Sequence, residues 1–145
     1  MTGLGGQPPG TVVLTLDARP ENLVLTRLAL AGVAANAGAP SDVVADLKLA
    51  VTEACTNVIQ HAYGGDGSIG TIVVRYRAEP GMLSVQVEDS GPGFEPAGVP
   101  ETTEQNGADS GMGLMIIRVL TDELEISDTG SGTRLTLVKR FSPES

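Results

Sequence analysis

Asp89 stands at the end of an alternating apolar run and is followed by the turn Ser90-Gly91-Pro92-Gly93. An ionised carboxylate only accepts hydrogen bonds, so at a strand end it can accept one from an exocyclic amino group such as that of adenine. Gly91 and Gly93 would let the backbone approach a flat ligand closely. An ordinary Gly-Pro turn with a solvated aspartate explains the same residues, so this motif alone is a weak indication of a site.

A second pair of glycines, in Gly111-Met112-Gly113, precedes an apolar run that begins at Leu114. Glycines before a helix let backbone N–H groups converge, and the helix dipole favours an anion at that end. The motif is not a dinucleotide fingerprint, because the third glycine is missing and the preceding segment is polar rather than strand-like. A flexible loop-to-helix junction is the simpler alternative.

Glu53 and Asn57 form the third group, four residues apart in a stretch with helical periodicity. This separation places both side chains on one helix face, one turn apart. A solvated helix face would contain such a pair as well, so it carries little weight alone. In their order along the chain, however, the three groups predict one site made of a cation ligand, a base pocket and a phosphate turn.

The elements that must position these residues follow from hydrophobic periodicity. Alternation predicts an antiparallel hairpin joined at Pro80-Gly81 and ending near Asp89, and helical spacing predicts two consecutive helices separated at Gly38-Ala39-Pro40. The complete prediction is strands near 11–16, 72–77, 83–88, 124–126 and 135–137, with helices from Pro20 to Gly38, from Ser41 to about Ala62 and from Leu114 to Leu120.

This order of elements predicts an α+β fold, a two-layer sandwich in which three helices cover one face of a mostly antiparallel sheet. Residues 11–141 are expected to form a single domain, with tails at 1–10 and 142–145. The stretch from Glu95 to Ser110 is acidic, contains no Lys or Arg, and is predicted to be a long loop. A loop of this length in a compact domain is usually a functional lid or is disordered.

Charge and composition exclude several classes of function. The formal net charge is −9, from 18 acidic and 9 basic residues, so neither a nucleic-acid surface nor an anionic membrane is an expected partner. The apolar stretch from Leu23 to Ala39 is interrupted by Arg27 and Asn36 and is short for a bilayer. The N-terminus lacks the pattern of a signal peptide, and the single cysteine, Cys55, cannot form an internal disulfide, so a cytoplasmic location is expected.

Taken together, the motifs resemble a known superfamily, the ATPases of gyrases, chaperones and histidine kinases, which share the Bergerat ATP-binding fold. Its N, G1, G2 and G3 boxes are similar to Glu53-Ala-Cys-Thr-Asn57, Asp89-x-Gly91-x-Gly93, Gly111-x-Gly113 and Gly132-Thr133. The short single-domain layout, with the runs 52–63 and 110–118, resembles the bacterial anti-sigma-factor serine/threonine kinases. The resemblance covers roughly residues 11 to 141, nearly the whole chain.

The resemblance implies an ATP site with Mg²⁺, in which Asn57 is the metal ligand and Glu53 the general base for an attacking hydroxyl. It implies that Asp89 accepts a hydrogen bond from the adenine amino group with support from Thr133, and that the 95–110 loop is the lid. The remaining implied nucleotide-binding residues are Gly91 and Gly93 at the adenine and Gly111, Met112 and Gly113 at the phosphates.

The function that the resemblance implies is that of an ATP-dependent serine/threonine protein kinase, a transferase that regulates transcription as an anti-sigma factor. Its partners would be a sigma factor and a small antagonist of the anti-anti-sigma (STAS) type, and its form a homodimer. The main alternative is a non-catalytic ATP-binding switch. Glu53 favours the enzyme, whereas a lid without Lys or Arg favours the switch. A stand-alone ATPase also stays open, while a histidine-kinase fragment is disfavoured because the phosphoacceptor hairpin is missing.

Overall fold

The computed structural model describes residues 11–63, 70–89, 107–128 and 132–142. The expected tail at 1–10, and all of that at 142–145 except Ser142, lie outside these residues. A short 3-10 helix, η1 (Pro20–Asn22), leads into the first α-helix. In chain order the other elements are β1 (Thr11–Asp17), α1 (Leu23–Ala37), α2 (Ser41–Tyr63), β2 (Thr71–Glu79), β3 (Met82–Asp89), α4 (Gly107–Leu120), β4 (Glu123–Asp128) and β5 (Thr133–Arg140).

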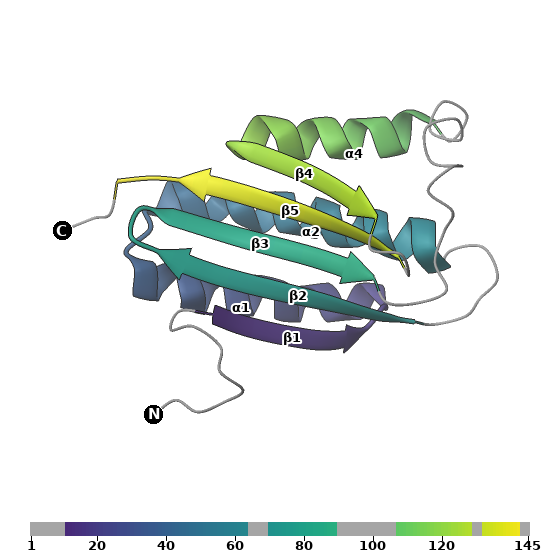
Figure 1. Cartoon of the computed structure of the whole chain (residues 1–145), viewed down its shortest axis with the longest axis horizontal. Coiled ribbons are helices and arrows are strands. Elements are labelled where there is room, and N and C mark those ends of the chain that lie inside the picture. Colours follow the sequence, from purple (N-terminus) through teal and green to yellow (C-terminus); the bar gives the residue numbers. More distant parts are fainter. Residues whose placement is uncertain (1–10, 64–69, 90–106, 129–131, 143–145) are drawn as a thin grey trace.

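The five described strands form one sheet in the order β1-β2-β3-β5-β4, and every neighbouring pair is antiparallel. Helices α1 and α2 lie against one face of this sheet, and α4 lies beside α2 next to β4 (Figure 1). The expected α+β, two-layer architecture is therefore confirmed. Because none of the described helices covers the opposite face, alternate residues of each strand form a second surface, here called the open face.

Two glycines end elements by adopting left-handed backbone. Gly38 follows α1 with φ of 73° and donates its N–H to the Ala34 and Ala35 carbonyls, so the predicted helix end is confirmed. Gly81 has φ of 75° and joins β2 to β3 at the predicted Pro80-Gly81 turn. Both positions favour glycine because a side chain there would strain the backbone.

Helix α4 begins earlier than predicted, at Gly107 instead of Leu114. The glycine pair and the polar stretch before it suggested a loop, yet Ala108 and Asp109 suit the first turn of a helix. A glycine costs a helix about 1 kcal/mol relative to alanine. The packing of α4 against α2 outweighs this preference, because most helical stability in proteins comes from tertiary contacts.

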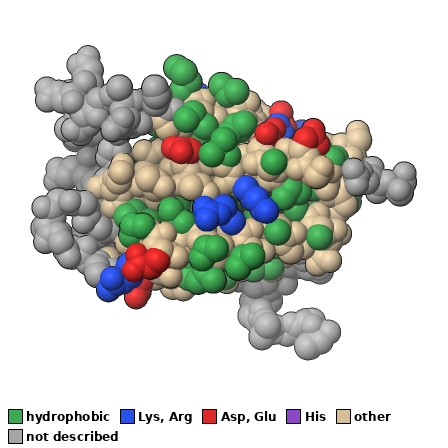
Figure 2. Space-filling model, turned by 180° about the vertical axis from the view of Figure 1, so that it is seen from behind, with side chains coloured by type: hydrophobic (Ala, Val, Ile, Leu, Met, Phe, Trp, Pro, Cys, Tyr) green, Lys and Arg blue, Asp and Glu red, His purple; other side chains and the backbone are tan. Residues whose placement is uncertain are grey.

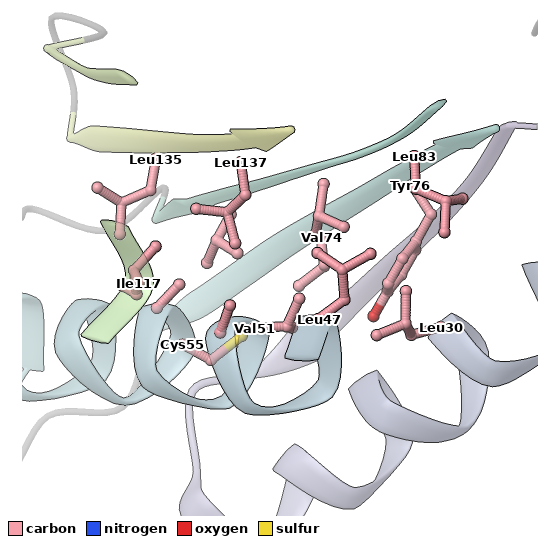
Figure 3. Packing of buried hydrophobic residues seen from close by; sticks show 14 of the residues in the cluster. Leu30, Leu47, Val51, Cys55, Val74, Tyr76, Leu83, Ile117, Leu135 and Leu137 are labelled. Atoms are coloured by element: carbon pink, nitrogen blue, oxygen red, sulfur yellow. The ribbon is translucent and has the colours of Figure 1, made fainter. Parts of the chain in front are cut away.

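The core lies between the sheet and α1 and α2, with Ile117 of α4 also buried in it (Figure 3). An apolar stripe of α2 is buried there, with exposures of 4% or less at Leu47, Val51, Ala54 and Val58. Cys55 is equally buried, and burial raises the pKa of its thiol to about 12, so it is a neutral packing group. The buried phenol hydroxyl of Tyr76 donates to the Thr26 carbonyl at 2.7 Å.

None of the described helices is long and apolar enough to cross a bilayer.

Candidate nucleotide-binding site

Glu53 and Asn57 lie on the side of α2 that faces α4, and both side chains are half-buried. A Cβ added to Gly113 of α4 would stand 3.0 Å from Asn57 Nδ2 and 3.3 Å from Glu53 Oε1. The missing side chain at Gly113 therefore lets the two helices approach with both polar groups between them. The structure brings Gly113 next to a carboxylate and an amide that precede it by some sixty positions in the sequence.

The amide of Asn57 is the polar group of this site whose bonding is incomplete. Its Nδ2 atom is buried and has no hydrogen-bond partner in the part of the chain that the structure describes. A buried amide without a partner costs about 1–3 kcal/mol, so such a group calls for an explanation. A half-turn of the terminal torsion exchanges nitrogen and oxygen, and the oxygen is a hard ligand suited to Mg²⁺. The residue type and its unsatisfied state thus fit a cation ligand.

Asp89 lies at the last position of β3, on the side of the sheet that the helices cover, and its side chain is only 1% exposed. Its Oδ2 accepts the backbone N–H of Thr133 at 3.1 Å. A Cβ added to Gly132 would stand 2.6 Å from Asp89 Oδ1 and 2.5 Å from the Asp89 carbonyl. The predicted pair Asp89 and Thr133 is therefore in direct contact, and only glycine fits at position 132.

The predicted turn at Gly111-Met112-Gly113 is replaced by helix, since α4 already includes these residues. Inside an α-helix, each N–H pairs with the carbonyl four residues earlier, so the N–H groups of Gly111 and Gly113 are used within α4. The N–H groups that a helix leaves without such a partner belong to its first four residues, here 107–110. In this conformation Gly113 contributes close approach to Glu53 and Asn57 rather than a phosphate-binding turn.

Several predicted site residues cannot be placed. Gly91, Gly93 and most of the predicted lid lie outside the described residues, and the side chain of Met112 is not described. Among the described residues, the candidate nucleobase pocket is represented by Asp89, Gly132 and Thr133.

Sequence reasoning missed an ion-pair cluster directly behind Asp89, on the open face. Glu88 Oε1 accepts from Arg75 Nη1 at 2.9 Å and from Arg134 Nε at 3.3 Å. Arg134 therefore points away from the helices. The signal available was the alternation of β2, β3 and β5, which places all three charged residues on outward positions.

Comparison with known families supports a nucleotide-binding function. The profile of the histidine kinase-like ATPase domain matches residues 16–139. A serine-protein kinase RsbW of Bacillus pumilus is 35% identical over 143 residues, which cover 92% of this chain and 87% of that protein. A serine-protein kinase RsbW of Bacillus licheniformis is 34% identical over 135 residues, with coverage of 88% and 83%.

A solved structure gives the same result for the fold. The crystal structure of the RsbU and RsbW domains of Rv1364c from Mycobacterium tuberculosis superimposes with a TM-score of 0.67 at 28% identity. The match covers 93% of this chain and 33% of that longer chain, so this chain spans about a third of it.

Proposed function

This chain belongs to the histidine kinase-like ATPase family and, within it, to the RsbW serine-protein kinases, and from this premise we propose that it regulates a sigma factor. In this proposal it phosphorylates a serine or threonine of an anti-anti-sigma (STAS-type) antagonist and sequesters the sigma factor that the antagonist would release. The observation that supports catalysis most directly is the meeting of Glu53, Asn57 and Gly113 between α2 and α4.

Each contact has a chemical role in this proposal. The Asp89 carboxylate accepts a hydrogen bond from the adenine amino group while its Oδ2 is held by the Thr133 N–H. Glu53 would accept the proton of the attacking hydroxyl, and its place one helical turn from Asn57 is consistent with a base that acts beside the phosphates. Gly113 keeps the space beside the Glu53 carboxylate and the Asn57 amide free of a side chain. Phosphoryl transfer depends mainly on how the reacting groups are positioned, and in this proposal these residues supply that positioning.

Asn57 is proposed to hold Mg²⁺, which when bound neutralises charge on the triphosphate. The described residues contain no cluster of three or more His, Cys, Asp or Glu side chains that could hold a metal by themselves. A single amide ligand is consistent with Mg²⁺, because this ion keeps several waters and is usually bound through one or two protein oxygens plus substrate phosphates.

The partner surface is proposed to lie on the side of the molecule that the helices cover. There α1 exposes Val24, Leu25 and Leu28, the last with 64% of its surface accessible. Figure 2 shows hydrophobic side chains gathered on this side. Exposed apolar surface of this kind suits protein contacts. In this proposal a second copy of the chain is one of the partners, so that the protein is a homodimer. Its proposed location is the cytoplasm. Residues 11–141 would form the whole of this kinase domain.

The competing function is a switch that binds ATP without transferring phosphate. The absence of Lys and Arg between residues 95 and 110 favours it, since no cation of that segment could neutralise the γ-phosphate. Incubation with Mg·ATP and the antagonist, followed by detection of phosphoserine or phosphothreonine on the antagonist, separates the two functions. Phosphate on the antagonist establishes the kinase, whereas a nucleotide-dependent complex without phosphate establishes the switch.

Gly113→Ala tests whether close approach at this position serves catalysis. The added methyl would meet the ends of Asn57 and Glu53, which must move by a few tenths of an ångström. Because a misplacement of about 1 Å can cost about 100-fold in rate, transfer is expected to fall by roughly tenfold. The melting temperature should hold or rise, since alanine favours helix by up to about 1 kcal/mol over glycine.

Gly32→Ala is the matched control for that variant. Gly32 is also helical, but a Cβ there would meet no atom within 4 Å. This variant should gain stability and keep the parent rate of transfer, both measured by thermal melting and antagonist phosphorylation. Equal rates in Gly113→Ala and Gly32→Ala would contradict a catalytic reason for the glycine at position 113.

A further inference from the structure

The ion-pair cluster on the open face lies directly beside the residues that contact the nucleobase in the proposed function. Glu88 precedes Asp89 on β3, and Arg134 follows Thr133 on β5. Successive residues of a strand point to opposite faces, so Glu88 is on the open face while Asp89 is on the face covered by the helices. The two groups occupy opposite sides of the same short piece of backbone.

Glu88 ties β3 to both of its neighbouring strands through one oxygen atom. Its Oε1 accepts from Arg75 of β2 at 2.9 Å and from Arg134 of β5 at 3.3 Å. The Glu88 side chain is 18% exposed, whereas the other cross-strand Arg–Glu pair of the described sheet, Arg140 with Glu123, is more than half exposed at both ends. Charge-assisted bonds that are partly shielded from water are stronger and hold geometry better than fully solvated ones.

Glu88 and Arg134 are also the last residue pair in the register of β3 with β5. Beyond this pair the strands are joined by the Thr133 N–H, which donates to Asp89 Oδ2 at 3.1 Å. Gly132 approaches Asp89 so closely that a Cβ would not fit. The position of the Asp89 carboxylate relative to Thr133 therefore depends on how firmly this final pair is held.

We propose that Glu88, held by Arg134 and Arg75, is a positioning residue for the nucleobase. By fixing the end of the β3–β5 ladder, it sets the direction of the Asp89 carboxylate and so the affinity and selectivity for a purine that carries an exocyclic amino group at C6. This inference rests on the proposed function, and it adds a determinant that lies on the far side of the sheet from the ligand.

The test compares Glu88→Gln with Glu123→Gln. Glutamine keeps the size of the side chain but removes the charge, and the control loses the Arg140–Glu123 pair, 2.6 Å long, at the other end of β5. Titration calorimetry with Mg·ATP and Mg·GTP is expected to show roughly three- to fivefold weaker ATP binding and a lower ATP/GTP preference in Glu88→Gln only. The KM for ATP should rise by the same factor while kcat stays at the parent value.

Variants of Arg134 separate positioning from general stability. Arg134→Lys keeps a cation for Glu88 and should restore most of the ATP/GTP preference that Arg134→Gln loses, although both remove the guanidinium. If parent and Glu88→Gln chains bind ATP with the same affinity and the same ATP/GTP preference, the inference is wrong. If the parent chain binds no ATP at all, the proposed function itself fails, and the two results are thereby distinguished.

Discussion

Replacing Glu53 by glutamine is expected to slow phosphoryl transfer to the antagonist by about 10²- to 10⁴-fold, while ATP affinity changes by less than about twofold. Glutamine has nearly the same size, so the close approach to Gly113 across the α2–α4 interface is kept. The amide cannot accept the proton of an attacking hydroxyl, and only that step is lost. Single-turnover phosphorylation at saturating ATP measures the rate, and calorimetry measures binding.

Asp46→Asn is the matched control for this variant, because Asp46 is the nearest other carboxylate on α2. Its Oδ2 stands 3.6 Å from Lys139 Nζ of β5, and the Asp46 side chain is 42% exposed. This variant should transfer phosphate at the parent rate. A Glu53→Gln chain that is as fast as Asp46→Asn would refute the general-base role and leave positioning as the only contribution of the α2 residues.

Much of the fold could be predicted because strand alternation and turn glycines mark many of its elements in the sequence. The alternation of β2 and β3 is uninterrupted, and Gly38 and Gly81 adopt the left-handed backbone that makes them good markers of element ends. The start of α4 could not be predicted, since its first turn is polar and contains glycines. That helix depends on packing against α2, which is distant in sequence. The placement of β5 between β3 and β4 likewise follows from pairing that no local pattern encodes.

The candidate site likewise has features that the local sequence predicts and features that depend on contacts between distant elements. The spacing of Glu53 and Asn57 gave their common direction, because helical geometry alone determines it. Their contact with Gly113 needs the α2–α4 interface, and the tight fit of Gly132 on Asp89 needs the register of β3 with β5. Both glycines belong to motifs visible in the sequence, but which atoms each glycine makes room for became clear only from the fold.

The nucleobase end of the site should give the second large effect. Asp89→Ala is expected to weaken Mg·ATP binding by about 1–3 kcal/mol, or roughly 5- to 150-fold, because the adenine amino group would be buried without an acceptor. GTP carries a keto group at that position and should lose much less affinity. Since the carboxylate is 1% exposed and also accepts the Thr133 N–H, some loss of folding stability is expected too.

Asp122→Ala and Asp89→Asn separate binding from folding. Asp122 Oδ2 accepts the Arg140 N–H at 2.6 Å, a matching carboxylate-to-β5 bond at the opposite end of the strand, so its loss should lower stability and leave ATP affinity unchanged. Asparagine at position 89 can still accept from Thr133, but it offers one acceptor oxygen instead of two, so this variant should stay folded and bind ATP weakly. Parent-like ATP affinity in a folded Asp89→Asn chain, together with an unchanged ATP/GTP preference, would mean that Asp89 secures β5 and that adenine is recognised elsewhere.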